Sequence, residues 1–253
     1  MFANAHAHLR RYYMSGELDA VIKKATENGL ELILNAGIDL QSSINAAKVA
    51  KNYDIVYACV GVHPWNADKL DQVTKTKLRD LTREEKVIAV SEIGLDFVSK
   101  RDLIAQSTSV PLPKQLQVET FQNQIRLAKD AELPIFLHDN AAHSEVLEVL
   151  KQENASEVGG AIHGFNGDLA LAKECIDLGF CISIGRAILT PENVILQDVV
   201  KGIPITKLLI ETDGGDPSDV KNVAHKVAEL KGISLEEVGR TTTSTLRTIL
   251  KIC

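Results

Sequence analysis

Histidine residues recur along the chain directly after short apolar runs. His6 and His8 close the first such run, in NAHAH, and His63 follows the third, in GVHP. His138 ends the fifth run, in PIFLH, and His163 ends the sixth, in GGAIH. Imidazole and carboxylate groups are the usual protein ligands of zinc and similar divalent ions in hydrolytic sites. The pattern therefore favours a metal centre assembled from distant parts of the chain.

Two carboxylates occupy equivalent positions. Glu92 follows the fourth apolar run, in AVSEIGLD, and Asp213 follows the eighth, in LLIETDGG. A glutamate can bridge two ions with its two oxygens, and a two-metal site activates a shared water and clamps the attacking and leaving oxygens of a displacement. An aspartate that binds one ion can also take the proton of the water. We therefore expect Glu92 and Asp213 to be catalytic at a centre of two divalent ions.

Taken singly, these residues have ordinary structural explanations. A histidine at a strand end is more often hydrogen-bonded than a ligand. Glu92 alone could pair with an arginine, and Asp213 alone could cap a following helix. His63 either positions a substrate or packs against Pro64 and Trp65. The metal hypothesis rests on the joint occurrence of ligand residues at the ends of several predicted strands.

The apolar runs that end in these residues are rich in Val, Ile and Leu, which is typical of buried parallel strands. They span residues 1–8, 31–36, 55–62, 87–93, 133–138, 160–163, 180–184 and 207–211. Stretches of helical periodicity lie between them, including 17–28 and 115–131. Eight strand–helix units in 253 residues predict an α/β protein with a (β/α)8 TIM barrel. The carboxyl ends of the strands would then meet at one face.

Residues 233–251 follow the eighth unit and predict an extra C-terminal helix or helix pair. Residues 98–114 are irregular, and we expect a long loop over one barrel face. A doubly wound open sheet is the structural alternative, but no GxGxxG follows the first strand. No boundary is visible, so we expect one domain over residues 1–253.

Composition restricts the functional class. The formal net charge of −6 argues against broad wrapping of nucleic acid, although it is compatible with a local basic cleft. No apolar run approaches the roughly 18 residues of a membrane span, and no signal-peptide pattern opens the chain. The cysteines, Cys59, Cys175, Cys181 and Cys253, lack CxxC spacing and predict reduced, mostly buried thiols. We expect a cytoplasmic protein with no membrane partner and no obligate protein partner.

The ordered motifs resemble those of the TatD-type metal-dependent deoxyribonucleases, a branch of the amidohydrolase-like TIM barrels. The matching segments are NAHAH, GVHP, SEIGLDF, FQNQIRLAKDAELPIFLH, AIHGFNG, LLIETD and VAELKGISLEEV. The resemblance implies hydrolysis of phosphodiester bonds in DNA with magnesium, manganese or zinc. It also implies one ion held by His6, His8 and Asp213 and a second held by His138 and His163, with Glu92 shared and His63 near the bound phosphate.

Several positions depart from the family pattern. Asn4 stands where the family usually has an aspartate that supports a ligating histidine, and a neutral amide does not raise the basicity of a ring as a carboxylate does. Asp139 and Asn140 replace a common serine and arginine, so a basic group that could hold phosphate is missing there. Only GGDPSDV follows the last strand before the next helix, in place of a longer segment.

Other cations can compensate for the missing basic group. Arg186, in SIGRAIL after the seventh strand, is a candidate for binding substrate phosphate, and Lys100 and Arg101 are further candidates. The main hypothesis is thus a hydrolase of DNA or short oligonucleotides that uses metal-activated water. The alternative is an amidohydrolase- or lactonase-like enzyme that acts on a small molecule with the same metal centre. A non-catalytic metalloprotein is disfavoured because all six proposed ligands are present.

Overall fold

The main sheet has eight parallel strands that follow one another around a nearly closed barrel, as predicted. The computed structural model describes residues 1–98, 100–102 and 107–252. The strands, in spatial order, are β1 (Phe2–Ala7), β2 (Leu30–Ala36), β3 (Val56–Val60), β4 (Val87–Asp96), β7 (Ile135–Asn140), β8 (Gly160–Ile162), β9 (Phe180–Ile184) and β10 (Leu208–Ile210). Spatial order follows chain order because each strand is joined to the next by a helical crossover.

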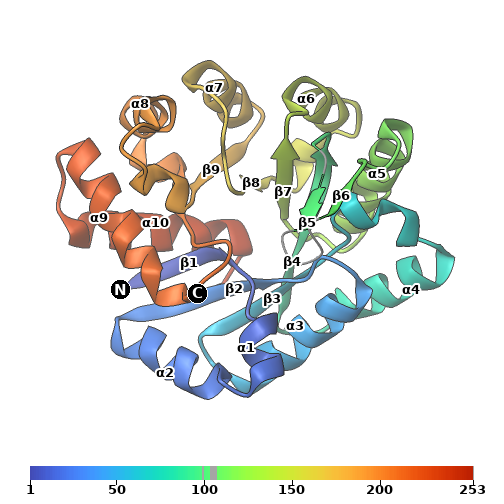
Figure 1. The fold of residues 1–253 in the computed structure, drawn as a ribbon, viewed down its shortest axis with the longest axis horizontal. Coiled ribbons are helices and arrows are strands. Elements are labelled where there is room, and N and C mark those ends of the chain that lie inside the picture. Colours follow the sequence, from blue (N-terminus) through green and yellow to red (C-terminus); the bar gives the residue numbers. More distant parts are fainter. Residues whose placement is uncertain (99, 103–106, 253) are drawn as a thin grey trace.

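Helices surround the strands (Figure 1). They are α1 (Arg10–Ser15), α2 (Leu18–Glu27), α3 (Leu40–Asn52), α4 (Gln72–Leu81), α5 (Lys114–Asp130), α6 (His143–Gln152), α7 (Leu169–Asp177), α8 (Val194–Gly202), α9 (Val220–Lys231) and α10 (Leu235–Leu250). The helices predicted over 17–28 and 115–131 correspond to α2 and α5. The predicted extra C-terminal helix is α10, which contacts β1 and β10.

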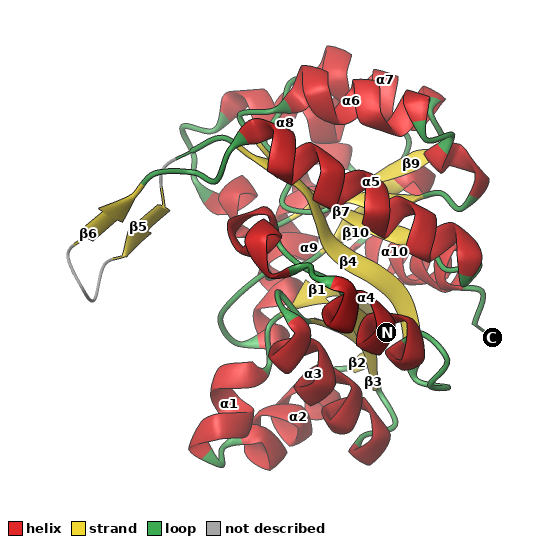
Figure 2. Cartoon of the chain, turned by 90° about the vertical axis from the view of Figure 1, so that its right-hand side faces the viewer, coloured by secondary structure: helices red, strands yellow, loops and turns green. Residues whose placement is uncertain are grey.

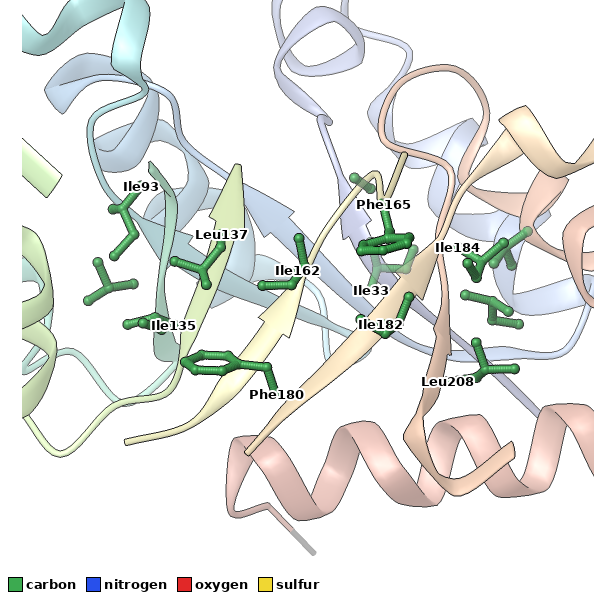
Figure 3. Close-up of a cluster of buried hydrophobic side chains, with 14 of the residues drawn as sticks. Ile33, Ile93, Ile135, Leu137, Ile162, Phe165, Phe180, Ile182, Ile184 and Leu208 are labelled. Carbon is green, nitrogen blue, oxygen red and sulfur yellow. The ribbon is translucent and has the colours of Figure 1, made fainter. Parts of the chain in front are cut away.

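Apolar packing between the strands and the helices accounts for this arrangement. Phe121, Ile125 and Ala128 lie on one face of α5 at spacings of four and three residues, and all are fully buried. They belong to the larger core cluster, which also contains strand residues such as Leu137. Figure 3 shows part of this cluster on neighbouring strands. A second cluster joins inner strand residues to Leu246 and other α10 side chains.

The last strand returns to the first through a short parallel bridge between Ala7 and Asp213. The amide of His8 donates to the carbonyl of Asp213 at 3.0 Å, and the amide of Asp213 donates to the carbonyl of His6 at 2.9 Å. The barrel is therefore closed by backbone that carries three of the predicted metal ligands.

The segment 98–114 differs from the expected loop over a barrel face, and that prediction was wrong. It contains two short antiparallel strands, β5 (Lys100–Asp102) and β6 (Ser107–Ser109). Figure 2 shows this hairpin projecting away from the barrel. Strand β4 also runs beyond its predicted end, because its pairing with β7 continues to Asp96 and Asn140.

Two further expectations concern membrane association and thiols. None of the helices in the described chain combines the length and apolar character that crossing a bilayer requires. Cys59, Cys175 and Cys181 are buried and free, as expected, whereas Cys253 lies outside the described residues.

Candidate metal centre

His6 and His8 direct their rings to one point at the carboxyl end of β1. Their Nε2 atoms are 3.4 Å apart. His8 Nε2 lies 2.9 Å from Glu92 Oε1 and 3.3 Å from Asp213 Oδ1, and His6 Nε2 lies 3.2 Å from the same Glu92 oxygen. Ligand atoms of all four residues lie within 4.8 Å of one another. Two imidazoles and two carboxylates therefore converge as predicted from the strand ends.

The two carboxylates occupy unusual backbone positions. Glu92 and Asp213 both have φ near +60°, a left-handed conformation that non-glycine residues rarely adopt. Glu92 also lies at an irregularity in the pairing of β4 with β7, between Ser91 and Ile93. A bulge of this kind redirects a side chain. Strained backbone at both carboxylates is typical of a functional site.

Glu92 divides its two oxygens between two groups of histidines. Its Oε1 faces His6 and His8, whereas its Oε2 lies 3.1 Å from His163 Nε2 and 3.7 Å from His138 Nδ1. The Glu92 side chain is only 3% exposed, so these contacts replace water around the carboxylate. This geometry is what a carboxylate shared between two ions requires.

Hydrogen bonds outside the cluster fix the orientation of two rings. His8 Nδ1 lies 3.1 Å from the carbonyl oxygen of Ala36, and His138 Nε2 lies 3.0 Å from Asp96 Oδ2. Since a carbonyl and an ionised carboxylate only accept, these nitrogens carry the hydrogens. In the neutral ring, the lone pair of the other nitrogen then points toward Glu92. Histidines that bind metal are held in this way.

In His63, unlike His8, the Nδ1 atom accepts a hydrogen bond. His63 is the N-cap residue of the 3₁₀ helix η1 (Pro64–Lys69), and its Nδ1 accepts the amide hydrogen of Trp65 at 3.0 Å. The hydrogen of the neutral ring is therefore on Nε2, which makes that atom a donor rather than a ligand. His63 lies close to Glu92 and His138, and the three form a second group with metal-ligand spacing.

His163 belongs to neither group of ligand atoms among the described residues, although it was expected beside His138. Its ring stacks on His6, with centroids 3.9 Å apart and planes within 2° of parallel. Its Nε2 faces Glu92, and its Nδ1 lies 3.7 Å from Glu211 Oε1. Its assignment to the second ion stays a prediction.

Charges in the cluster are strongly coupled. Burial alone would raise the pKa of Glu92, but His163 and His6 hold it well below its usual range. Burial opposes a charge on His8, yet hydrogen bonds with Asp213 and Glu92 raise its pKa to about 10. Against burial, Glu92 also raises the pKa of His163, and His8 lowers the pKa of Asp213. Without a metal ion, protons on His8 and His163 thus balance the two carboxylates.

The pKa values of two further rings, those of His6 and His63, are shifted in the opposite direction. Burial and the neighbouring His163 lower the pKa of His6, and burial lowers the pKa of His63 to about 3. The Nδ1 atoms of His6 and His163 are buried without a hydrogen-bond partner within the described part of the chain. The clustered imidazole nitrogens and the carboxylates of Glu92 and Asp213 form a donor set that fits zinc or manganese.

A cavity of about 550 Å³ opens above the cluster. Besides site residues, its lining includes Arg10, Arg11, Trp65 and Gly215. Arg186 is exposed and is not among the lining residues, but its guanidinium lies 2.8 Å from where a Cβ on Gly215 would stand. The structure therefore places Arg186 at the edge of the cavity.

The remaining cationic candidates for phosphate binding are Lys100 and Arg101, and Asp139 and Asn140 stand where a serine and an arginine were expected. The side chains of Lys100 and Arg101 lie outside the described part of the chain. Asp139 binds His143 Nδ1 at 2.7 Å, and Asn140 lies beside Asp96, with its Nδ2 3.4 Å from the carboxylate oxygens.

Sequence reasoning missed two buried carboxylates. Asp96 is fully buried and accepts from His138 and from the amide of Val98. Glu211 is also fully buried, and it accepts the amide of Gly164 at 2.7 Å. Asp96 belongs to the SEIGLDF motif and Glu211 to the LLIETD motif. An acidic residue within a buried strand is unusual, and this feature could have identified both as functional candidates.

The side chain of Asn4 does not hydrogen-bond to the ring of His6, whose Nδ1 has no hydrogen-bond partner among the described residues. Its Nδ2 donates to Thr212 Oγ1 at 2.8 Å and to the carbonyl of Pro217 at 3.2 Å. Its Oδ1 accepts the amides of Thr212 and His6, at 3.2 and 3.3 Å. The amide thus connects β1 to the segment after β10, which is a role that needs donors as well as acceptors.

Comparisons with known proteins agree with the fold and the motifs. The sequence model of the family described as TatD related DNase matches residues 4–251. The chain is 34% identical to the uncharacterized metal-dependent hydrolase YabD of Bacillus subtilis, with both chains covered in full. It is 29% identical to the 3'-5' ssDNA/RNA exonuclease TatD of Citrobacter koseri, over 92% of this chain and 93% of that protein.

A solved structure extends this likeness to three dimensions. The crystal structure of YjjV, a TatD homolog from Escherichia coli K12, matches with a TM-score of 0.89 and 26% sequence identity. The match covers 100% of this chain and 98% of the other.

Proposed function

Because the chain belongs to the TatD related DNase family, we propose that it is a metal-dependent hydrolase that cleaves phosphodiester bonds in DNA or short oligonucleotides with two divalent ions. The observation that carries the proposal is that the two oxygens of Glu92 face different histidines. Its Oε1 faces His6 and His8, and its Oε2 faces His163 and His138. One buried carboxylate between two sets of imidazoles is the arrangement expected of a dinuclear hydrolytic centre.

The ligands divide between the two proposed ions. His6, His8 and Asp213 would hold the first ion, His138 and His163 would hold the second, and Glu92 would be shared. When bound, divalent ions supply an activated water near neutral pH and neutralise charge on the phosphate. The nitrogen-rich donor set favours zinc or manganese over magnesium.

Residues around the cluster have separate tasks. The Asp213 side chain is 55% exposed, so one of its oxygens is available at the cavity to accept a proton from the attacking water. His63 Nε2 carries a hydrogen that can be donated to a phosphate oxygen. The Arg186 guanidinium beside Gly215 can pair with a neighbouring phosphate.

Metal analysis tests the ligand assignment. We expect purified protein to bind up to two equivalents of divalent ion, and a His6→Ala, His8→Ala double variant to bind fewer. His225→Ala is the matched control, because His225 is exposed on α9. Unchanged metal content in the double variant would contradict the assignment.

A substrate panel tests the reaction. Single-stranded DNA, bis-p-nitrophenyl phosphate, lactones and amides are assayed with Mg²⁺, Mn²⁺ or Zn²⁺. We expect hydrolysis of the two phosphodiesters. Turnover of a lactone or an amide without phosphodiesterase activity would reject the proposal in favour of a small-molecule hydrolase.

A further inference from the structure

Helix α5 carries buried polar side chains on the face that packs against the barrel. Gln117, Thr120 and Gln124 lie at spacings of three and four residues, and their exposed fractions are 1%, 5% and 1%. Apolar side chains are expected on such a face, because burial of an amide without hydrogen bonds is costly. The contacts of the two glutamines must therefore offset this cost.

Gln124 binds the backbone directly before His63. Its Oε1 accepts the amide of Val62 at 2.7 Å, and its Nε2 donates to the carbonyl of the same residue at 2.9 Å. Val62 lies beyond the end of β3 at Val60, so the side-chain amide supplies the partners that a neighbouring strand would otherwise supply. The next residue is His63, whose Nδ1 accepts the amide of Trp65. The orientation of the His63 ring therefore depends on a turn that Gln124 holds.

Gln117 makes the same type of contact about two helical turns earlier. Its Oε1 accepts the amide of Asp96 at 2.9 Å, and its Nε2 donates to the carbonyl of Asp96 at 3.0 Å. The same Nε2 also donates to the carbonyl of Leu112 at 2.9 Å. The carboxylate of Asp96 accepts from His138 Nε2 and from the amide of Val98. Gln117 therefore fixes the backbone of the residue that orients a proposed metal ligand.

The direction of α5 explains why these contacts reach the site. A helix that joins two parallel strands of a barrel runs antiparallel to them, so its first turns lie near the carboxyl ends of the strands. Thr120 Oγ1 accordingly donates to the carbonyl of Ala67 in η1 at 3.2 Å. Ile125 and Ala128, further along the helix, belong to the apolar core. The first half of α5 thus contacts the turns of the site through polar groups.

We propose that Gln117 and Gln124 are positioning residues of the metal centre. Gln117 holds Asp96, which orients His138 toward the second ion. Gln124 holds the turn that presents His63 to the substrate phosphate. The inference rests on the proposed function and deepens it, since the roles of His138 and His63 come from that proposal. A side-chain amide suits both tasks, because it offers a donor and an acceptor side by side, as a peptide group needs.

Replacement by methionine, an unbranched side chain without an amide, tests the inference. The variants are Gln117→Met and Gln124→Met. Gln115→Met is the matched control, because Gln115 is exposed on the same helix. Phe121→Leu is a second control, since Phe121 is fully buried on α5 and belongs to the apolar core. This variant measures what a less stable helix does by itself. Circular dichroism establishes that each variant is folded.

Deuterium exchange of backbone amides in the metal-free protein, followed by NMR, measures the positioning directly. The amides of Trp65 and Val98 donate to site side chains in the two turns, so their exchange reports whether each turn is held. We expect exchange at Trp65 to become about tenfold faster in the Gln124 variant only. Exchange at Val98 should become about tenfold faster in the Gln117 variant only.

Chelator competition measures the affinity for Zn²⁺ or Mn²⁺. Gln117→Met should weaken metal binding by about threefold to tenfold, because the carboxylate partner of His138 is displaced but still present. Gln124→Met should bind metal as the parent protein does, since His63 is a donor rather than a ligand. Both control variants should also bind metal with the affinity of the parent.

Equal exchange rates at Trp65 and Val98 in the glutamine variants and in Phe121→Leu would overturn the inference, because the glutamines would then act only through the stability of α5. Unchanged metal affinity in Gln117→Met would overturn the role assigned to that residue.

The parent protein provides a test that needs no variant to fold. The amides of Val62 and Asp96 should be protected from exchange, and rapid exchange there would reject the hydrogen bonds on which the inference depends. None of these measurements uses a substrate. A parent protein that does not hydrolyse bis-p-nitrophenyl phosphate would therefore reject the proposed function and leave the outcome for the two glutamines unaffected.

Discussion

Replacing Asn4 with aspartate, the residue usual at this position in TatD-type sequences, should destabilise this protein. Asn4 is fully buried and donates from Nδ2 to Thr212 Oγ1 and to the carbonyl of Pro217. An ionised carboxylate cannot donate. The Thr212 hydroxyl can rotate and donate to it instead, but the Pro217 carbonyl would face another acceptor.

The expected magnitude follows from these contacts. A buried acceptor left without a donor costs about 1–3 kcal/mol. Burial also raises the pKa of the new carboxyl, and each tenfold gain in its proton affinity on folding costs about 1.4 kcal/mol at neutral pH. We expect a total loss of about 2–4 kcal/mol, or roughly 5–15 °C in Tm for a protein of this size.

The loss should depend on pH in a defined direction. Because the carboxyl has a higher pKa in the folded than in the unfolded protein, the folded state binds more protons above about pH 4. The destabilisation is therefore absent below the unfolded pKa and grows as the pH rises through the folded pKa.

Urea unfolding at pH 5 and pH 8, with chelator present, measures this effect. Asn35→Asp is a comparison, since Asn35 is 3% exposed and its Oδ1 accepts the amide of Leu9, as a carboxylate also can. Equal stability of Asn4→Asp and the parent protein at pH 8 would refute the reasoning. A loss no larger than that of Asn35→Asp would also refute it, because charge burial alone would then explain the effect.

Three other measurements address the site and its support. Asp96→Asn should weaken metal binding by about 10–100-fold because His138 loses its carboxylate partner, and unchanged affinity in a chelator competition would contradict this. Metal binding at pH 7 should release at least one proton, because His8 has a pKa of about 10 and must lose its proton to act as a ligand. The metal affinity should therefore rise with pH, and calorimetry in buffers of different ionisation enthalpy detects the proton release. Gly94→Ala should lower the free energy of unfolding by more than about 3 kcal/mol, because its Cβ would lie 1.9 Å from the carbonyl oxygen of His138. Gly214→Ala is the control, since a Cβ there meets nothing within 4 Å, and equal stability of the two variants in urea unfolding would contradict the clash.

Much of the barrel could be predicted because most strands contain a short run of apolar residues. The range predicted for β9 matches residue for residue, since Phe180–Ile184 is buried throughout. The end of β4 was missed because its last residues are paired through tertiary contacts with β7. Helix α1 was missed because its six residues bury only Tyr12, so no apolar periodicity marks it.

The convergence of the site was predictable, but its internal orientation was not. Parallel strands bring His6, Glu92 and Asp213 to one face of a barrel whatever the details. Each oxygen of Glu92 faces a different group of histidines because of a bulge and a left-handed backbone at this residue. No local sequence pattern specifies these two features. The donor role of His63 depends on a contact with the Trp65 amide that only the folded turn creates.

Because Ala7 and Asp213 form a backbone bridge beside the metal centre, metal binding should also affect the stability of the barrel. An ion held by His6 and His8 on one side and Asp213 on the other would cross-link the first and last strands, and binding linkage would add about 2.7 kcal/mol of stability at 100 times the dissociation constant. Metal depletion should then loosen this junction first, so the amides of His8 and Asp213, which are hydrogen-bonded across it, should exchange with deuterium earlier than those of β4. The metal concentration would therefore determine the stability of the junction that closes the barrel as well as the activity of the enzyme.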